Sequence, residues 1–224
     1  MALLILGHAV DAGRAGLPCS AVVNRPSDRL LGHRLLFLAR HGETEWNRAG
    51  RWQGKTDIPL SDAGRAQARA LGACLVGRGI VEVHASDLQR AAETAQIVAA
   101  TLGIAAFNVD VRLRERGFGC FEGFTREECA ERHPDAWARY LADRRATPPG
   151  GEPQGEVAAR VVAAMTELAG VPRATGEATL VISHGGTLRT FIHEVTGAAP
   201  PPLENGALFL ARYDGSRFVS VTRV

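Results

Sequence analysis

From residue 35 onward, short apolar runs alternate with longer amphipathic segments, and each apolar run ends at a polar or charged side chain. A run of about four to eight apolar residues bounded in this way is typical of a strand buried in a sheet. The pattern predicts strands over residues 35–39, 80–85, 105–109 and 179–182.

The segments between these runs have apolar residues three and four positions apart, which is the spacing of one helix face. Ser61 is a candidate N-cap for a helix with Leu71 and Leu75 on its buried face, before Gly77 and Gly79. Similar faces are found at Leu88, Ala91, Ala95, Val98 and Leu102, stopped by Gly103; at Val157, Val161, Met165 and Leu168; and at Leu188, Phe191, Ile192 and Val195.

The end of the chain has the pattern of a β-hairpin: residues 207–213, the turn signal Asp214-Gly215, and residues 217–224. Alternating strands and helices favour right-handed crossovers and a parallel sheet covered on both faces. We therefore predict an α/β fold with three layers, α/β/α, in which the sheet is mostly parallel and the C-terminal hairpin adds an antiparallel edge.

Two regions do not follow the alternation. Residues 1–33 are interpreted as an N-terminal extension, either an added edge strand or disordered, ahead of one domain over residues 34–224. Residues 111–155 leave the strand–helix pattern, and Thr125 with Glu128 forms a capping box for a short helix there. We expect a helical lid over about residues 116–155.

Composition narrows the class of protein. The chain has 224 residues, 46% hydrophobic and 22% charged, as in ordinary globular domains, and a formal net charge of +2. Such a charge gives no reason to expect a nucleic-acid partner or a basic membrane patch. No apolar run approaches the roughly 18 residues of a membrane span. Four cysteines without C-x-x-C spacing indicate neither a disulfide framework nor a zinc site, so a cytoplasmic location is expected.

Three predicted strands are followed by groups that could bind an anion: Arg40-His41, Ser86-Asp87 with Arg90, and His184. The carboxyl ends of parallel strands open onto a common crevice, so these groups can converge. Arg90 also falls in the first turn of its helix, where free backbone N–H groups favour an anion. The pattern suggests phosphate chemistry; capped strand ends with surface side chains are the alternative.

A family resemblance is carried by motifs spread over residues 35–186. They are Leu38-Ala39-Arg40-His41-Gly42-Glu43-Thr44 with Asn47; Gln53-Gly54-Lys55-Thr56-Asp57-Ile58-Pro59-Leu60-Ser61; Ser86-Asp87-Leu88-Gln89-Arg90-Ala91-Ala92-Glu93-Thr94-Ala95; Leu113-Arg114-Glu115 through Phe121-Glu122-Gly123; and Ser183-His184-Gly185-Gly186. In this order the motifs resemble the histidine phosphatase superfamily, the phosphoglycerate-mutase-like enzymes.

The resemblance implies a role for each matching residue. His41 would be the nucleophile that becomes phosphorylated, and Glu115 the general acid and base. The catalytic set would be completed by Arg40, Arg90 and His184, and the phosphate- or substrate-binding set is Arg40, Asn47, Gln53, Thr56, Arg90, His184 and Gly185. Glu122 is a competing carboxylate with an expected structural role. No metal or other cofactor is implied, because guanidinium and imidazolium groups would take the place of magnesium.

Attack by His41 requires a neutral ring, and the reference pKa of histidine is about 6.5. The neighbouring cations Arg40 and Arg90 should oppose a further positive charge and lower that pKa.

Within the family, the chain resembles the phosphatase branch, including α-ribazole phosphatases and phosphoglycerate-type phosphatases. Residues 124–147 are shorter than the insertion of the mutases, and Arg144-Arg145 lacks the Ser-Tyr that follows there. The expected partner is a small phosphomonoester, on a monomer or a homodimer. The alternatives are a 2,3-bisphosphoglycerate-dependent phosphoglycerate mutase and a phosphate-binding or scaffold protein without activity.

Overall fold

The computed structural model describes residues 32–224. Its centre is a six-stranded sheet with the strand order β3-β2-β4-β1-β5-β6. The strands are β1 (Arg34–Arg40), β2 (Ile80–Ala85), β3 (Asn108–Val109), β4 (Ala178–Ser183), β5 (Leu208–Tyr213) and β6 (Phe218–Arg223). The pairs among β1, β2, β3 and β4 are parallel, and β5 and β6 form an antiparallel hairpin on the β1 side. The mostly parallel sheet and its edge hairpin are confirmed.

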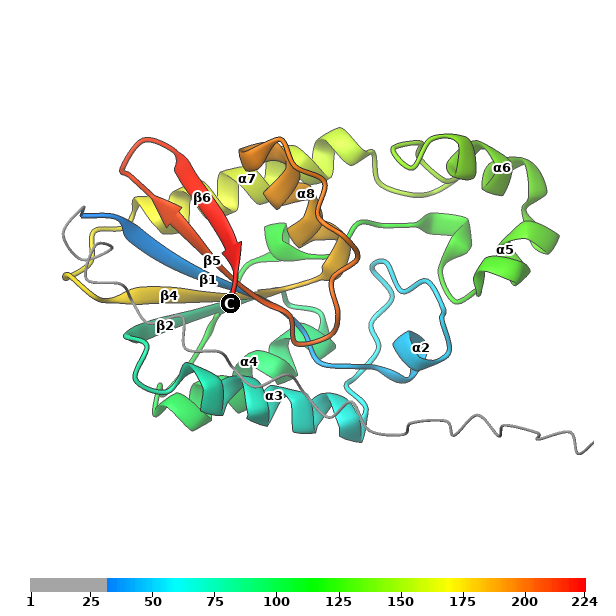
Figure 1. Ribbon diagram of the computed structural model, residues 1–224. Coiled ribbons are helices and arrows are strands. Elements are labelled where there is room, and N and C mark those ends of the chain that lie inside the picture. Colours follow the sequence, from blue (N-terminus) through cyan, green and yellow to red (C-terminus); the bar gives the residue numbers. More distant parts are fainter. Residues whose placement is uncertain (1–31) are drawn as a thin grey trace, which may run out of the picture.

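Helices cover both faces of this sheet, with α3 and α4 on one face and α7 and α8 on the other (Figure 1). The helices are α2 (Glu45–Arg48), α3 (Asp62–Leu75), α4 (Gln89–Leu102), α5 (Arg126–Arg132), α6 (Pro134–Ala142), α7 (Gln154–Gly170) and α8 (Gly185–Thr196), with 3₁₀ turns η1 (Val111–Leu113) and η2 (Gly119–Phe121). The predicted three-layer architecture is therefore confirmed.

Strand β1 shows why its sequence is apolar throughout. Leu36 and Leu38 pack into the core beneath α7 and α8, whereas Leu35, Phe37 and Ala39 pack into the core beneath α3 and α4. A strand with helices on both faces has no solvent-facing side, so alternation with polar residues is lost.

The strand predicted over residues 105–109 is shorter than expected. Only Asn108 and Val109 pair, with the last two residues of β2, at the edge of the sheet. Ala105 and Ala106 are exposed. At an edge these residues have no core face to fill, so the apolar run does not extend the strand.

Residues 116–155, where a lid was expected and which we call the lid, carry α5 and α6 beyond the carboxyl ends of the parallel strands (Figure 1). The capping box of Thr125 and Glu128 is present at the start of α5, and Pro134 occupies the first turn of α6. The lid has its own aromatic core, separate from the two cores of the sheet, formed by Phe118, Phe121, Cys129, Ala136, Trp137 and Tyr140.

Three other expectations concern the chain as a whole. The N-terminal extension, residues 1–33, lies outside the described residues except for its last two. Within residues 32–224 no helix is both long enough and apolar enough to cross a membrane. Cys74 is disulfide-bonded, which the spacing of the cysteines did not indicate. The cysteines therefore carry no argument about compartment.

Candidate active site

A cavity of about 600 Å³ opens at the carboxyl ends of β1, β2 and β4, between the sheet and the lid. Its floor, as we call it here, consists of Arg40, His41 and Arg90, which line the cavity, and of His184, which is outside the lining and contacts His41 and Arg90. The register of β1 and β4 explains how two of these meet. Arg40 pairs with Ser183, so the next residues, His41 and His184, are neighbours with ring centroids 5.1 Å apart.

His41 is buried, with 2% of its surface exposed. Its Nδ1 donates a hydrogen bond to the carbonyl oxygen of Gly42 at 2.6 Å, so Nε2 is left with the lone pair. Gly42 makes this turn possible, because a Cβ there would lie 2.4 Å from the carbonyl oxygen of Gly64. Burial, followed by the charges of Arg40 and Arg90, holds the pKa of His41 well below its usual value. The ring is thus neutral and able to act as a nucleophile.

His184 is fully buried. Its Nδ1 accepts a hydrogen bond from Nε of Arg90 at 3.2 Å, so Nε2 carries the proton. Burial, followed by the charge of Arg90, holds the pKa of His184 well below its usual value. The imidazolium expected from the resemblance is therefore a neutral imidazole in the structure. It still offers an N–H donor.

Arg90, in the first turn of α4, is almost completely buried and is oriented by the loop that contains Gly54 and Thr56. It donates to the carbonyl oxygen of Thr56 at 2.9 Å and to that of Gly54 at 2.8 Å. Burial lowers the pKa of its guanidinium to about 10. The group stays charged at neutral pH, and two of its five N–H donors remain for another acceptor.

Two floor atoms, Nε of Arg40 and Nε2 of His184, are buried donors without a hydrogen-bond partner among the described residues. Buried donors are nearly always hydrogen-bonded in proteins, so two neighbouring donors without a partner indicate a place for an acceptor. Gly185 keeps the approach to Arg40 open, because a Cβ there would lie 3.2 Å from Nε. The floor is suited to an anion with several acceptor oxygens, such as phosphate.

Glu115 reaches the cavity from the loop between η1 and η2 and lies at the N-terminus of α8. Its carboxylate accepts hydrogen bonds from the backbone N–H groups of Gly186, Thr187 and Arg116, each at 2.9 Å, and from the hydroxyl of Thr187 at 3.0 Å. Gly186 permits this contact, since a Cβ there would lie 2.6 Å from Oε1 of Glu115. The other acidic residue of the cavity wall, Glu194, is exposed. Glu115 is therefore the carboxylate placed for proton transfer.

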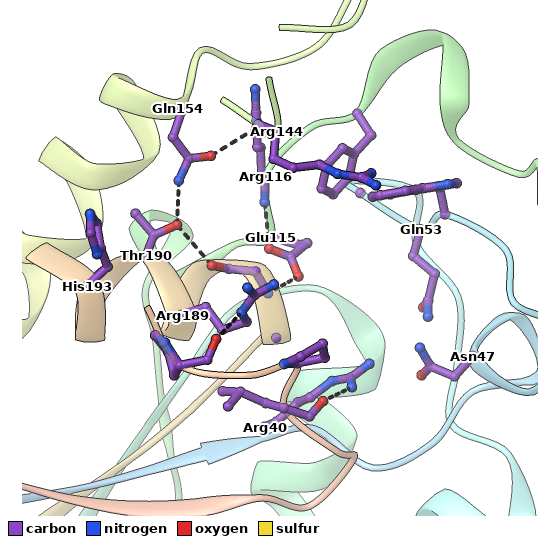
Figure 2. Close-up of a pocket in the computed structure, with 18 of the residues that line it drawn as sticks. Arg40, Asn47, Gln53, Glu115, Arg116, Arg144, Gln154, Arg189, Thr190 and His193 are labelled. Atoms are coloured by element: carbon purple, nitrogen blue, oxygen red, sulfur yellow. Dashed lines mark hydrogen bonds between the residues drawn. The ribbon is translucent and has the colours of Figure 1, made fainter. Parts of the chain in front are cut away.

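Asn47 and Gln53 lie on one side of the cavity, opposite Gln154, Thr190 and His193 (Figure 2). Oδ1 of Asn47 accepts from the backbone of Thr44 and from the side chain of Asn205, both at 3.1 Å, which leaves its amide nitrogen as a donor. Oε1 of Gln53 is buried without a partner among the described residues.

Thr56 does not lie where the sequence comparison suggested. It is absent from the cavity wall, and its hydroxyl donates to Oε2 of Glu122 at 2.6 Å. Glu122 also accepts from the backbone N–H of Phe118 at 2.8 Å. These contacts tie the loop that follows Trp52 to the lid, so Thr56 supports the wall instead of contacting its contents.

Several residues of the site carried no signal in the sequence. Asn205 holds both Asn47 and the carbonyl oxygen of His41 from the loop before β5. The mouth of the cavity, as we define it, consists of four exposed arginines: Arg126, Arg144, Arg145 and Arg189. Arg144 lies over the ring of Tyr140, at 5.0 Å from its centroid. Apart from the pair Arg144-Arg145, these residues match no motif.

Residues 36–223 match the model of the histidine phosphatase superfamily (branch 1). Among curated proteins, the chain is 35% identical over 167 residues to two Arabidopsis thaliana proteins, phosphoglycerate mutase-like protein 4 and a metal-independent phosphoserine phosphatase. The match covers 73% of this chain in both cases and 72% and 69% of the relatives. A probable phosphoglycerate mutase of Serratia proteamaculans is 37% identical over 164 residues, covering 72% of this chain and 74% of that protein.

The chain is also similar to solved structures of phosphatases. A mycobacterial glucosyl-3-phosphoglycerate phosphatase superimposes with a TM-score of 0.74 at 28% identity, over 85% of this chain and 97% of that one. A putative α-ribazole-5'-phosphate phosphatase of Escherichia coli superimposes with a TM-score of 0.73 at 25% identity, over 85% and 96%.

Proposed function

The chain belongs to branch 1 of the histidine phosphatase superfamily, and on that premise we propose that it hydrolyses a small phosphomonoester without a metal, through a phosphohistidine formed on His41. One observation supports this most strongly. The lone pair of His41 lies in the same cavity floor as two buried donors, on Arg40 and His184, that have no partner among the described residues.

In the first step, Nε2 of His41 attacks phosphorus, the P–N bond forms, and the bond from phosphorus to the leaving oxygen breaks. Glu115 enters this step protonated and gives its proton to the leaving alkoxide. Phosphoryl transfer needs mainly positioning and donors directed at the equatorial oxygens. Arg40, Arg90 and His184 would supply those donors, with the amide nitrogen of Asn47.

In the second step, the carboxylate of Glu115 takes a proton from water as the water oxygen attacks phosphorus. The P–N bond breaks, its electron pair returns to Nε2, and inorganic phosphate leaves. Because the two steps use the same groups in reverse proton roles, one carboxylate is sufficient.

The substrate class in this proposal is a small phosphorylated metabolite, which suits a cavity of about 600 Å³. The floor and Glu115 come from one chain, so either a monomer or a homodimer is compatible with it. We keep the cytoplasm as the proposed compartment, because this substrate class is metabolic.

A mutase is the second candidate, because relatives carry that name and Arg144 and Arg145 lie at the mouth, where they could hold a second anionic group. The two superimposed structures described above are a phosphatase and a putative phosphatase, which favours hydrolysis. A non-catalytic phosphate-binding protein is disfavoured by the complete set of His41, Glu115 and the floor donors.

One assay separates these readings. Phosphate release would be measured from p-nitrophenyl phosphate, 3-phosphoglycerate and a panel of other phosphomonoesters, with and without 2,3-bisphosphoglycerate and EDTA. We expect release that EDTA does not reduce and that the bisphosphate does not stimulate. Phosphoglycerate isomerisation dependent on the bisphosphate would indicate the mutase. Phosphate binding without any turnover would indicate the binding protein.

A further inference from the structure

Glu115 lies on a stretch of backbone that belongs to no helix or strand. It follows η1, which ends at Leu113, and precedes η2, which begins at Gly119. A general acid must lie within hydrogen-bond reach of the atom that it protonates, and misplacement of about 1 Å can cost about 100-fold in rate. Some other part of the chain must therefore fix this segment.

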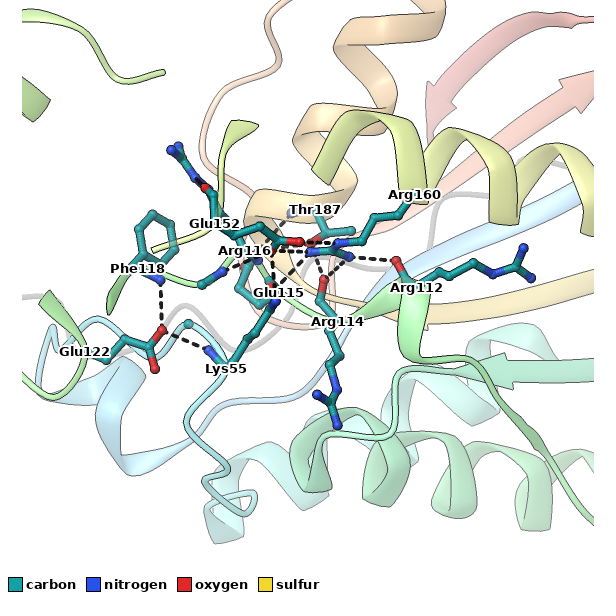
Figure 3. Close-up of polar contacts among 12 residues, drawn as sticks. Lys55, Arg112, Arg114, Glu115, Arg116, Phe118, Glu122, Glu152, Arg160 and Thr187 are labelled. Carbon is teal, nitrogen blue, oxygen red and sulfur yellow. Dashed lines mark hydrogen bonds and ion pairs between the residues drawn. The ribbon is translucent and has the colours of Figure 1, made fainter. Parts of the chain in front are cut away.

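Arg160, on α7, is directed at that segment and uses all five of its N–H donors (Figure 3). Nη1 donates to the carbonyl oxygens of Arg112 at 2.7 Å and Arg114 at 2.6 Å, and Nη2 donates to that of Glu115 at 3.2 Å. Its two remaining bonds go to the carboxylate of Glu152, at 2.8 and 2.9 Å.

Glu152 fixes Arg160 in turn. The side chains of the pair are 17% and 10% exposed, so both are largely removed from solvent. The backbone N–H of Glu152 donates to the carbonyl oxygen of Gly117 at 2.8 Å, and Lys55 lies 3.4 Å from its carboxylate. The acid segment, as we call residues 112–117, is therefore tied to α7 through the carbonyl oxygens of Arg112, Arg114 and Glu115, and to Glu152 through that of Gly117.

Arg116 makes a contrasting set of contacts. It also uses five donors, on the carbonyl oxygens of Arg144, Arg145, Ala146 and Glu152 and on the side chain of Gln154. Three of those acceptors belong to residues 144–146, which include two of the mouth arginines, Arg144 and Arg145. Of these two arginine side chains, only Arg160 donates to the carbonyl oxygen of Glu115. Arg160 is also not part of the cavity wall, whereas Arg116 is.

We infer that Arg160 is a positioning residue for proton transfer: it sets the reach of Glu115 to the leaving oxygen, and Glu152 holds it in place. The inference rests on the proposed function, in which Glu115 is the acid. Glu152 is ion-paired with Arg160, and the charge of Arg160 is the smallest of the five causes that lower the pKa of His184, so the main effect is one of geometry.

The test uses two substrates that differ in their need for a proton. Glycerol phosphate releases an alkoxide that requires a general acid, whereas p-nitrophenyl phosphate releases a stable phenolate. Arg160→Met should lower kcat/KM for glycerol phosphate about 100-fold and that for p-nitrophenyl phosphate only a few-fold, as expected for an acid displaced by about 1 Å. Arg160→Lys keeps three donors, so its kcat/KM for glycerol phosphate should fall by an intermediate factor, again with a smaller loss for p-nitrophenyl phosphate.

Glu115→Gln is the reference, since it removes the acid outright and should show the same selectivity more strongly. Arg173→Lys is the matched control. Arg173 is 16% exposed at the side chain and is ion-paired with Glu82, away from the acid segment. It should leave both activities unchanged.

Each outcome decides the inference. Equal losses on both substrates in soluble Arg160→Lys would mean a purely structural role and would overturn it. If Arg160→Met does not fold, the same test is made with Arg160→Lys and Glu152→Gln, by comparing their losses of kcat/KM for glycerol phosphate and for p-nitrophenyl phosphate. Wild type inactive on both substrates would instead refute the proposed function, so the two failures are distinguishable.

Discussion

The floor of the cavity and its mouth are held by the fold in opposite ways. The floor groups His41, Arg90 and His184 are at most 2% exposed, and they are oriented by contacts with the carbonyl oxygens of Gly42 and Gly54 and by the bond between Arg90 and His184. The mouth arginines are exposed, and Arg144 lies over the rings of Tyr140 and Trp137. Buried groups position the phosphate chemistry, whereas the lid and α8 present exposed charges at the mouth that a substitution can remove at little structural cost.

This difference separates the residues that determine the reaction from the residues that determine the substrate preference. Buried floor groups keep one geometry for every substrate. Exposed mouth arginines contribute binding energy that depends on the part of the substrate away from its phosphoryl group. Floor variants should therefore lose activity on all phosphomonoesters, and mouth variants should change the preference among them.

The largest effect is expected from His41→Ala. Loss of the nucleophile should reduce kcat by at least about 10⁴-fold on every substrate, as for nucleophiles of other covalent enzymes. Rapid quenching in alkali, where a phosphohistidine survives, should trap phosphoenzyme in the wild type and none in the variant. His84→Ala, on β2 and outside the cavity wall, is the control and should retain activity. Phosphoenzyme in His41→Ala would place the nucleophile elsewhere.

The second prediction concerns the lid core. Trp137 is buried in the aromatic cluster that is separate from the sheet cores, so Trp137→Ala should lower the free energy of unfolding of the lid by about 3 kcal/mol or more. Urea unfolding followed by fluorescence and by far-UV circular dichroism would measure it. Leu141→Ala, exposed on the same helix, should cost under about 0.5 kcal/mol. Abolished turnover of p-nitrophenyl phosphate in folded Trp137→Ala would show that floor and lid are not separable.

The floor was more accessible to sequence reasoning than the rest of the site. A buried strand that ends at Arg40 or Ser183 is encoded by neighbouring residues, and parallel strand ends share an edge whatever the loops do. Position alone therefore predicted that Arg40, His41, Arg90 and His184 would meet. The α4 helix was accessible for the same reason, because its buried face and the left-handed Gly103 at its end are local features.

The remaining features depend on contacts between distant segments. The neutral state of His184 follows from complete burial beside Arg90, which a reading of charges alone cannot supply. Thr56 turns to Glu122, 66 positions away, and so leaves the cavity wall. The five bonds of Arg160 likewise exist only once α7 packs beside the acid segment. No short-range pattern of residues specifies such contacts.

A third prediction uses pH. His41 and His184 are neutral when folded, with pKa values below that of an unfolded histidine. Below about pH 6.5 the unfolded chain therefore binds more protons, and the free energy of unfolding should fall by about 1 kcal/mol for each histidine between about pH 7.5 and 5.5. Carboxylates with lowered pKa lose their contribution at more acidic pH. In urea titrations, His184→Asn should show a shallower pH dependence than the wild type; equal slopes would mean that His184 is not buried neutral.

The smallest effect is expected at the mouth. Arg144→Ala removes an exposed guanidinium that stacks on Tyr140, so stability should change little. For a phosphomonoester with a second anionic group, such as 3-phosphoglycerate, kcat/KM should fall about five-fold, since an exposed charge contributes on the order of 1 kcal/mol. For p-nitrophenyl phosphate, which has no second anion, it should stay the same. Arg139→Ala, exposed on α6 and outside the cavity wall, is the matched control. An equal loss on both substrates would assign Arg144 to the reaction itself, and the separation of floor from mouth would then fail at this residue.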